Sequence, residues 1–177
     1  MDKLEKIRKE YDDFYRSLLK KGKLPMRDTE VGFWGTAAIG DVYELFKKID
    51  LSRFKRFIDL GSGDGKVVMI ASLFTSAAGV EFDRELHKKA VEIRDKLGVK
   101  AELICGDFLR MDISKYDIVF INPDRAFHRG VEQKLRKELK GKLIVYNLVY
   151  QPAGMKKGRT YWVGKTAQTP ATLYTIK

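Results

Sequence analysis

Short apolar runs alternate with helical patterns from residue 56 onwards, and this alternation limits the possible folds more than any other property of the chain. The apolar runs lie at 56–60, 78–81, 101–104, 116–121 and 142–148. Segments of helical periodicity lie between most of them, at 67–74, 84–97 and 131–139. Such alternation indicates βαβ units, whose parallel strands are buried in one sheet with helices on both faces. Right-handed crossovers then give a doubly wound α/β topology.

Further elements flank this α/β core at both ends. Apolar residues at helical spacing predict an amphipathic helix over residues 3–20 and a second helix over 36–49. Near the C-terminus, the runs at 160–164 and 171–176 predict an antiparallel hairpin at one edge of the sheet. We therefore expect a mostly parallel seven-stranded sheet with an antiparallel C-terminal hairpin and an N-terminal helical extension.

The composition is typical of a soluble globular domain, with 44% hydrophobic and 33% charged residues. The 177 residues contain no repeat or low-complexity linker, which predicts a helical extension over 1–30 and one main domain over 31–177. No run approaches the roughly 20 apolar residues that a membrane span needs. The first residues are too charged for a secretory signal. We therefore expect a cytoplasmic protein that does not act on a membrane.

A single cysteine, Cys105, excludes an intramolecular disulfide and provides no zinc-ligand spacing. We therefore expect no metal site. A lone cysteine of this kind is more often a small buried residue than a nucleophile.

Positive charge is concentrated in the C-terminal part of the chain. The net charge is +11, and residues 122–177 contain 12 lysines and arginines against three acidic residues. Two interpretations stay open. The charges are ordinary solvated side chains, or they form a basic face that meets an acidic partner such as RNA or an acidic protein.

A glycine-rich segment, Asp59-Leu-Gly-Ser-Gly-Asp-Gly65, directly follows the first apolar run and opens a helix. Glycines let the backbone turn tightly and approach a ligand without a Cβ in the way. The helix N-terminus adds unpaired N–H groups and a positive dipole end. Glu81 ends the second apolar run, where a carboxylate can accept both hydroxyls of a ribose. Loop and acid together indicate a site for a nucleoside-containing cofactor at the carboxyl ends of the strands.

The spacing of these glycines distinguishes two cofactor classes. The dinucleotide fingerprint G-x-G-x-x-G requires a glycine where this chain has Lys66, which disfavours a nicotinamide-dependent dehydrogenase. The observed G-x-G-x-G, with an acid two residues before it, resembles motif I of the class I S-adenosylmethionine-dependent methyltransferases. This resemblance implies S-adenosylmethionine as cofactor, with a Rossmann-like fold. The residues that it assigns to the cofactor are Asp59, Gly61 and Gly63 at the methionine part, Glu81 at the ribose, and Ser62, Gly65 and Phe82 beside them.

Asp107 and Phe108 follow the third apolar run, in Cys-Gly-Asp-Phe. In the same family an acid at this place bonds the adenine amino group, and the next residue packs near the ring. The resemblance therefore implies these two roles for Asp107 and Phe108. The alternative is a turn residue followed by a core aromatic.

The segment Asn122-Pro123-Asp124 ends the fourth apolar run and resembles motif IV, where the methyl acceptor meets the cofactor. Amino-methylating members have Asn or Asp, then Pro-Pro and an aromatic, so Asp124 and Arg125 depart from the pattern. This departure weakens the case for an exocyclic amine of a base. Asn122, which would also border the cofactor, and the Pro123 carbonyl would aim the accepting nitrogen. Asp124 would take a proton or bind a basic substrate, His128 is a conceivable base, and a plain Asn-Pro turn is the alternative.

A second resemblance concerns the acceptor. The segments Lys134-Leu-Arg-Lys-Glu-Leu139 and Thr172-Leu-Tyr174 are similar to segments of archaeal protein-lysine methyltransferases. Members of that group carry a threonine near the cofactor, before the first strand, and Thr36 matches it. Phe33 and Trp34 precede the second helix and are expected in core or lid packing, with stacking on a substrate base as the alternative.

These observations predict a methyltransferase that acts on a macromolecular nitrogen, in protein lysine or in RNA. The alternative is a catalytically inactive nucleic-acid-binding protein that keeps the methyltransferase fold. Binding of S-adenosylmethionine would distinguish both of these hypotheses from a dehydrogenase. Turnover would distinguish the methyltransferase from the inactive nucleic-acid-binding protein. The sequence does not predict the oligomeric state.

Overall fold

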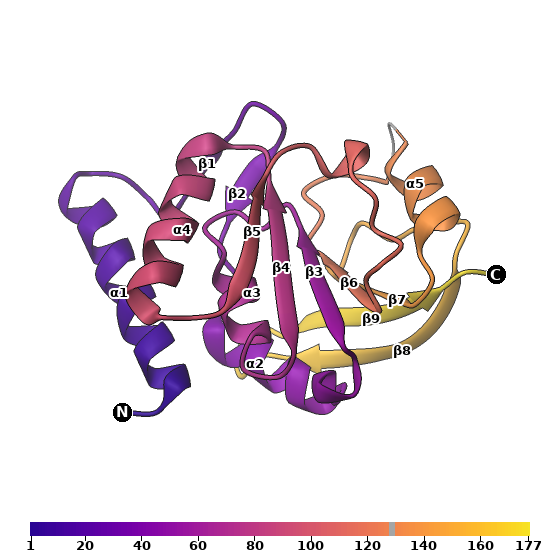
Figure 1. Ribbon diagram of the computed structural model, residues 1–177, viewed down its shortest axis with the longest axis horizontal. Coiled ribbons are helices and arrows are strands. Elements are labelled where there is room, and N and C mark those ends of the chain that lie inside the picture. The colour runs from indigo at the N-terminus through magenta and orange to yellow at the C-terminus, as the bar shows by residue number, and fades with distance from the viewer. Residues whose placement is uncertain (128–129) are drawn as a thin grey trace.

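The computed structural model describes residues 1–127 and 130–177 and has one seven-stranded sheet, in the order β5-β4-β3-β6-β7-β9-β8 (Figure 1). Its strands are β3 (Arg56–Leu60), β4 (Ser76–Glu81), β5 (Ala101–Cys105), β6 (Ile118–Ile121), β7 (Lys142–Tyr146), β8 (Lys156–Val163) and β9 (Thr169–Thr175). The first five are parallel to one another, whereas β9 runs antiparallel to both β7 and β8. The predicted doubly wound sheet with an antiparallel C-terminal hairpin is confirmed.

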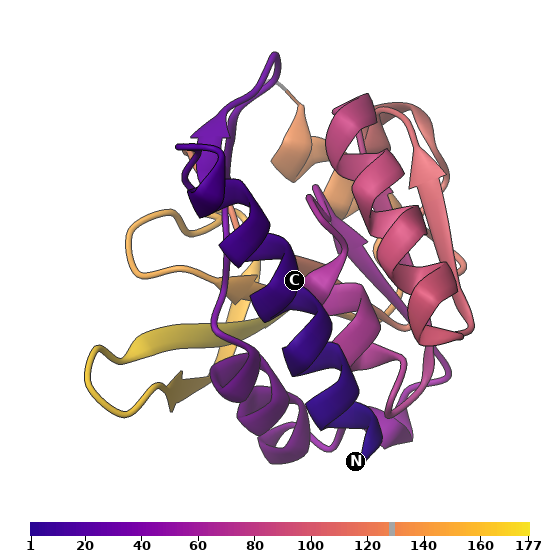
Figure 2. The same cartoon turned by 90° about the vertical axis from the view of Figure 1, so that its left-hand side faces the viewer.

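Helices cover both faces of this sheet. The helices are α1 (Lys3–Lys20), α2 (Ile39–Lys48), α3 (Lys66–Ala71), α4 (Arg84–Leu97) and α5 (Val131–Glu138), with 3-10 turns η1 (Leu51–Arg53) and η2 (Phe108–Arg110). The core on one face includes residues of α2, α3 and α4, whereas α5 packs on the other face. Figure 2 shows α1 running diagonally across the helices of the face that carries α2, α3 and α4. Helix α1 contacts both α3 and α4.

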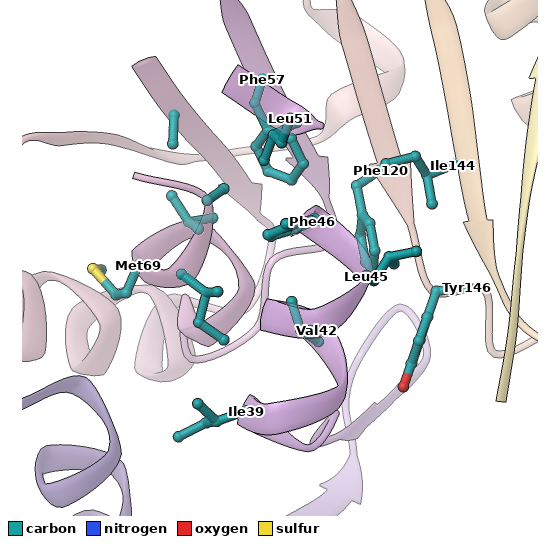
Figure 3. Packing of buried hydrophobic residues seen from close by; sticks show 14 of the residues in the cluster. Ile39, Val42, Leu45, Phe46, Leu51, Phe57, Met69, Phe120, Ile144 and Tyr146 are labelled. Atoms are coloured by element: carbon teal, nitrogen blue, oxygen red, sulfur yellow. The ribbon is translucent and has the colours of Figure 1, made fainter. Parts of the chain in front are cut away.

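Each face of the sheet has its own hydrophobic core, because successive residues of a strand point to opposite sides. Phe57 of β3 and Phe120 of β6 pack with Phe46 of α2 on one side (Figure 3). Their neighbours Ile58 and Val119 belong to the core that includes α5. Both cores hold the carboxyl ends of the central strands in fixed register, and these ends carry the predicted site.

The sequence did not reveal a small two-stranded hairpin between α1 and α2. Its strands are β1 (Met26–Asp28) and β2 (Phe33–Gly35), with Arg27 opposite Trp34. Strands of three residues are too short to produce a recognisable alternation of apolar and polar side chains. This hairpin nevertheless borders the candidate site.

Two further expectations need correction. β8 begins at Lys156 rather than at residue 160, because its first four residues are exposed and polar on an edge strand and carry no hydrophobic signal. Cys105, expected to be buried, is exposed, since it ends β5 at the opposite edge of the sheet. Within the described ranges, no helix is both long and apolar enough to cross a membrane. The division of the chain at residue 30 stays a prediction.

Candidate active site

The carboxyl ends of β3, β4 and β6 open into a cleft of about 1280 Å³. Its walls include every residue that the sequence assigned to cofactor or acceptor except Gly65, namely Thr36, Asp59, Gly61, Ser62, Gly63, Glu81, Phe82, Asp107, Phe108, Asn122, Pro123 and Asp124. Gly65 lies behind the wall, where a Cβ would come within 2.9 Å of the Ala90 Cβ on α4. Gly65 therefore allows α4 to pack closely against the loop.

Backbone hydrogen bonds fix the glycine loop between β3 and α3. The N–H groups of Gly61 and Ser62 both donate to the carbonyl of Val80, at 2.9 and 3.0 Å. Gly61 has a φ of 77°, and a Cβ there would meet no atom within 4 Å. This glycine therefore satisfies a left-handed backbone and leaves space for a ligand in front of it.

Glu81 connects the loop to the beginning of α4. One carboxylate oxygen accepts the N–H of Gly63 at 2.7 Å, and the other accepts the N–H of Asp83 at 2.8 Å. Burial raises the pKa of this carboxyl, and the two backbone donors oppose the shift. Because a carboxylate offers about four acceptor positions, Glu81 keeps acceptor capacity for a hydroxyl donor of a ligand.

Asp59 lies deeper in the cleft and is only 3% exposed. Burial raises the pKa of its carboxyl well above the usual value, and the nearby Glu81 and Asp64 add to the shift. No hydrogen bond to its carboxylate occurs within the parts of the chain that the structure describes. A buried acid without a donor is costly, so Asp59 is well placed to receive a cationic group of a ligand.

Helix α1 holds the loop from outside, a feature that sequence reasoning missed. The Tyr15 hydroxyl donates to the Asp64 carboxylate at 2.5 Å, and the Tyr11 hydroxyl donates to the Asp64 carbonyl at 2.9 Å. The ammonium of Lys66 lies 4.8 Å from the centre of the Tyr15 ring. Burial raises the pKa of Asp64 and lowers that of Lys66, while their mutual attraction opposes both shifts. The spacing of Tyr11 and Tyr15 indicated one helix face, but not its polar partners. Thr36 contacts the same Tyr15 hydroxyl.

On the predicted adenine side, Asp107 has a structural task as well. One of its carboxylate oxygens accepts the N–H of Leu109 at 2.9 Å and thereby caps η2. Phe108 is half-buried against the α5-side core, and Phe82 is 39% exposed on the cleft wall. The structure therefore shows Asp107 as the capping residue of a turn, and its hydrogen bond to adenine stays a prediction.

At the acceptor end, the three residues after β6 differ in their surroundings. Asn122 is exposed on the cleft wall. The Pro123 carbonyl accepts the side-chain N–H of Asn147 at 2.9 Å, a partner that the sequence did not suggest. The Asp124 carboxylate accepts the backbone N–H of Phe33 at 2.7 Å. His128 lies outside the described residues.

Residues 30–143, more than half of the chain, match the model of the family described as "Histone methylation protein DOT1". The chain belongs to the DOT1 family. This membership confirms the predicted likeness to class I methyltransferases, including the lysine-modifying ones. In the described part of this DOT1-family chain, no group of three or more His, Cys, Asp or Glu is arranged to hold a metal ion.

One relative and several solved structures are similar to this chain. A protein-lysine N-methyltransferase of Saccharolobus islandicus is 33% identical over 87 residues, which are 46% of this chain and 54% of that protein, so the match spans about half the relative's length. An RNA methyltransferase from Salinibacter ruber, solved with S-adenosyl-L-homocysteine, superposes with a TM-score of 0.65 at 23% identity over 81% of this chain and 95% of that one. A SAM-dependent methyltransferase from Aquifex aeolicus gives 0.59 at 18% identity over 77% and 90% of the two chains. The structural likenesses show that the fold is shared.

Proposed function

We propose that this DOT1-family chain transfers a methyl group from S-adenosylmethionine to the amine of a lysine side chain in a protein. The observation that carries the proposal is the single cleft that joins the glycine loop and Glu81 to the exposed Asn122. Lysine is proposed as acceptor because the curated relative is a protein-lysine N-methyltransferase and because Asp124 and Arg125 replace the proline and aromatic that amino-methylating enzymes of bases carry.

The polar groups and the open space of the cleft fit this cofactor. The cleft has a volume of about 1280 Å³, which is ample for a ligand of nucleoside size with an amino-acid tail. The unpaired Asp59 suits the tail's ammonium, Gly61 leaves space for the tail, and Glu81 has acceptor capacity for a ribose hydroxyl. When bound, the cofactor supplies a methyl group activated on a sulfonium.

The chain's own residues then position and desolvate the acceptor. A lysine ammonium must lose a proton before its lone pair can attack, and transfer from water to an apolar rim lowers its pKa. Exposed apolar side chains on the two segments that contact Pro123 and Asp124 provide such a rim: Phe33, whose N–H donates to Asp124, and Leu148 and Val149, which follow the Pro123 partner Asn147. The Asn122 side-chain oxygen and the second lone pair of the Pro123 carbonyl accept the amine hydrogens and orient the nitrogen.

The test supplies tritiated S-adenosylmethionine with two matched peptides, one with lysine and one with arginine in its place, and with an RNA of mixed sequence. The proposal predicts label on the lysine peptide only, with methyl-lysine identified by mass spectrometry and loss of label with Glu81→Ala. Label on RNA alone would overturn the choice of acceptor. Tight cofactor binding without transfer to any acceptor would favour the inactive nucleic-acid-binding alternative.

A further inference from the structure

The hairpin β1–β2 lines the cleft along most of its length, and we call residues 26–35 the strap. Its two strands pair only with each other in the described structure, not with the main sheet. An isolated two-stranded hairpin is marginally stable in water. The position of the strap therefore depends on the contacts that hold it to the rest of the molecule.

Three of the contacts that hold the strap lie along the cleft. Arg27 forms an ion pair with Asp83 at 2.9 Å, next to the Glu81 side of the cleft. Trp34 packs against the glycine loop, so close that a Cβ on Gly63 would be 2.8 Å from its ring. At the opposite side, the N–H of Phe33 donates to Asp124. The first two of these contacts lie at the cofactor end of the cleft, and the third lies at the acceptor end.

The third anchor is built for close contact. A Cβ on Gly32 would lie 2.4 Å from the Asp124 carboxylate oxygen that accepts the Phe33 N–H, so a side chain at this position would push the two segments apart. Arg125 folds back onto the same carboxylate, with nitrogens 3.2 and 3.3 Å from its two oxygens. The carboxylate therefore holds the strap and is turned toward donors of its own chain.

We infer that Asp124 is a positioning residue that latches the strap across the acceptor end of the cleft, and that it is not the proton acceptor of methyl transfer. With the latch closed, the strap encloses the cofactor and presents Val31 and Phe33, each about half exposed, as one wall of the acceptor entrance. The inference rests on the proposed function for the identity of the ligand, whereas the latch itself is a property of the free protein.

Three variants separate a latch from a base. Asp124→Ala removes the acceptor of the Phe33 N–H. Asp124→Asn keeps an oxygen in place but cannot act as a base. Gly32→Ala breaks the contact from the strap side and leaves the carboxylate intact. Gly40→Ala is the matched control, since it adds a methyl group where no atom lies within 4 Å.

The first readout is hydrogen exchange of the Phe33 amide, followed by NMR in cofactor-free protein. The latch predicts that the Phe33 amide exchanges at least about tenfold faster than in wild type in Asp124→Ala and Gly32→Ala. It predicts a smaller increase in Asp124→Asn and no change in Gly40→Ala. Unchanged exchange in Asp124→Ala, with its melting temperature preserved, would overturn the latch. This readout needs no ligand, so it stands even if the protein does not bind S-adenosylmethionine.

The second readout is the dissociation rate of S-adenosylhomocysteine, with the pH profile of methyl transfer. The latch predicts that Asp124→Ala and Gly32→Ala both release the ligand faster, and that Asp124→Asn shifts no limb of the pH profile. If instead Asp124→Asn abolishes transfer as fully as Asp124→Ala while Gly32→Ala behaves as wild type, Asp124 is a base and the inference is wrong. Absence of ligand binding to wild type would contradict the proposed function instead.

Discussion

The two ends of the cleft are built in different ways. At the cofactor end, Asp59 and Glu81 are at most 8% exposed, and the loop is tied to β4 and α1 by backbone and side-chain hydrogen bonds. At the acceptor end, Asn122 is exposed, and Pro123 and Asp124 are each held by one contact from a distant segment. A buried end held by several hydrogen bonds lies beside a more exposed end with fewer. This difference explains why short sequence motifs indicated the predicted cofactor end more clearly than the predicted acceptor end.

The largest expected effect comes from a comparison of two glycines that both have a left-handed backbone conformation. Gly61 and Gly98 have φ values of 77° and 63°, and a Cβ at either would meet nothing within 4 Å. Alanine at either should therefore cost about 1–2 kcal/mol of stability. Only Gly61→Ala places a methyl group in the cleft, so we expect it to weaken S-adenosylhomocysteine binding at least about a hundredfold, some 2.7 kcal/mol. Calorimetric titration of both variants measures this, and equal affinities would remove Gly61 from the cofactor wall.

A second prediction asks whether α1 belongs to the rigid end. Tyr15→Phe removes the hydroxyl that donates to the buried Asp64, which should cost about 1–3 kcal/mol of unfolding free energy. Tyr43→Phe is the control, because Tyr43 is half-buried and its hydroxyl has no hydrogen bond within the described ranges. Urea unfolding should separate the two variants. If the two variants lose the same free energy of unfolding, the hydrogen bond from Tyr15 does not hold the loop, and α1 only packs against it.

The third and smallest prediction concerns the unpaired acid. Asp59→Asn should stabilise the free protein at pH 8, because burial and the neighbouring acids raise the pKa of Asp59 in the folded state. A raised folded pKa means that stability is lost as pH rises above the unfolded value of about 3.9. The advantage of Asn should therefore be near zero at pH 4 and grow towards pH 8, while cofactor affinity falls. Thermal unfolding at both pH values measures it, and a pH-independent difference would refute the assignment.

The order of strands and helices from β3 onwards was predictable because each element carries its own periodicity. The cofactor motifs were predictable for a related reason, since each lies at the end of one strand and the ends of parallel strands meet at one edge. Prediction failed where the signal is short or distant. β1 and β2 have three residues each, and the polar start of β8 carries no apolar pattern.

The missed contacts of the site join segments far apart in the chain. Tyr15 and Asp64 are 49 residues apart, and Phe33 and Asp124 are 91 apart. Neither residue type nor local spacing indicates such pairs, because they form only when the sheet brings the segments together. The packing role of Gly65 was missed for the same reason: its partner Ala90 lies on another helix.

The most direct test of the account is calorimetric titration of S-adenosylmethionine and S-adenosylhomocysteine into wild type, Glu81→Ala and Glu102→Ala. Glu102 is an exposed acid on β5 outside the cleft, so its variant controls for the loss of one charge. We predict tight binding to wild type and Glu102→Ala. In Glu81→Ala we predict a loss of more than about 1.4 kcal/mol of binding free energy, which is a tenfold loss of affinity. Failure of folded wild type to bind either ligand would contradict the assignment of this cleft to S-adenosylmethionine.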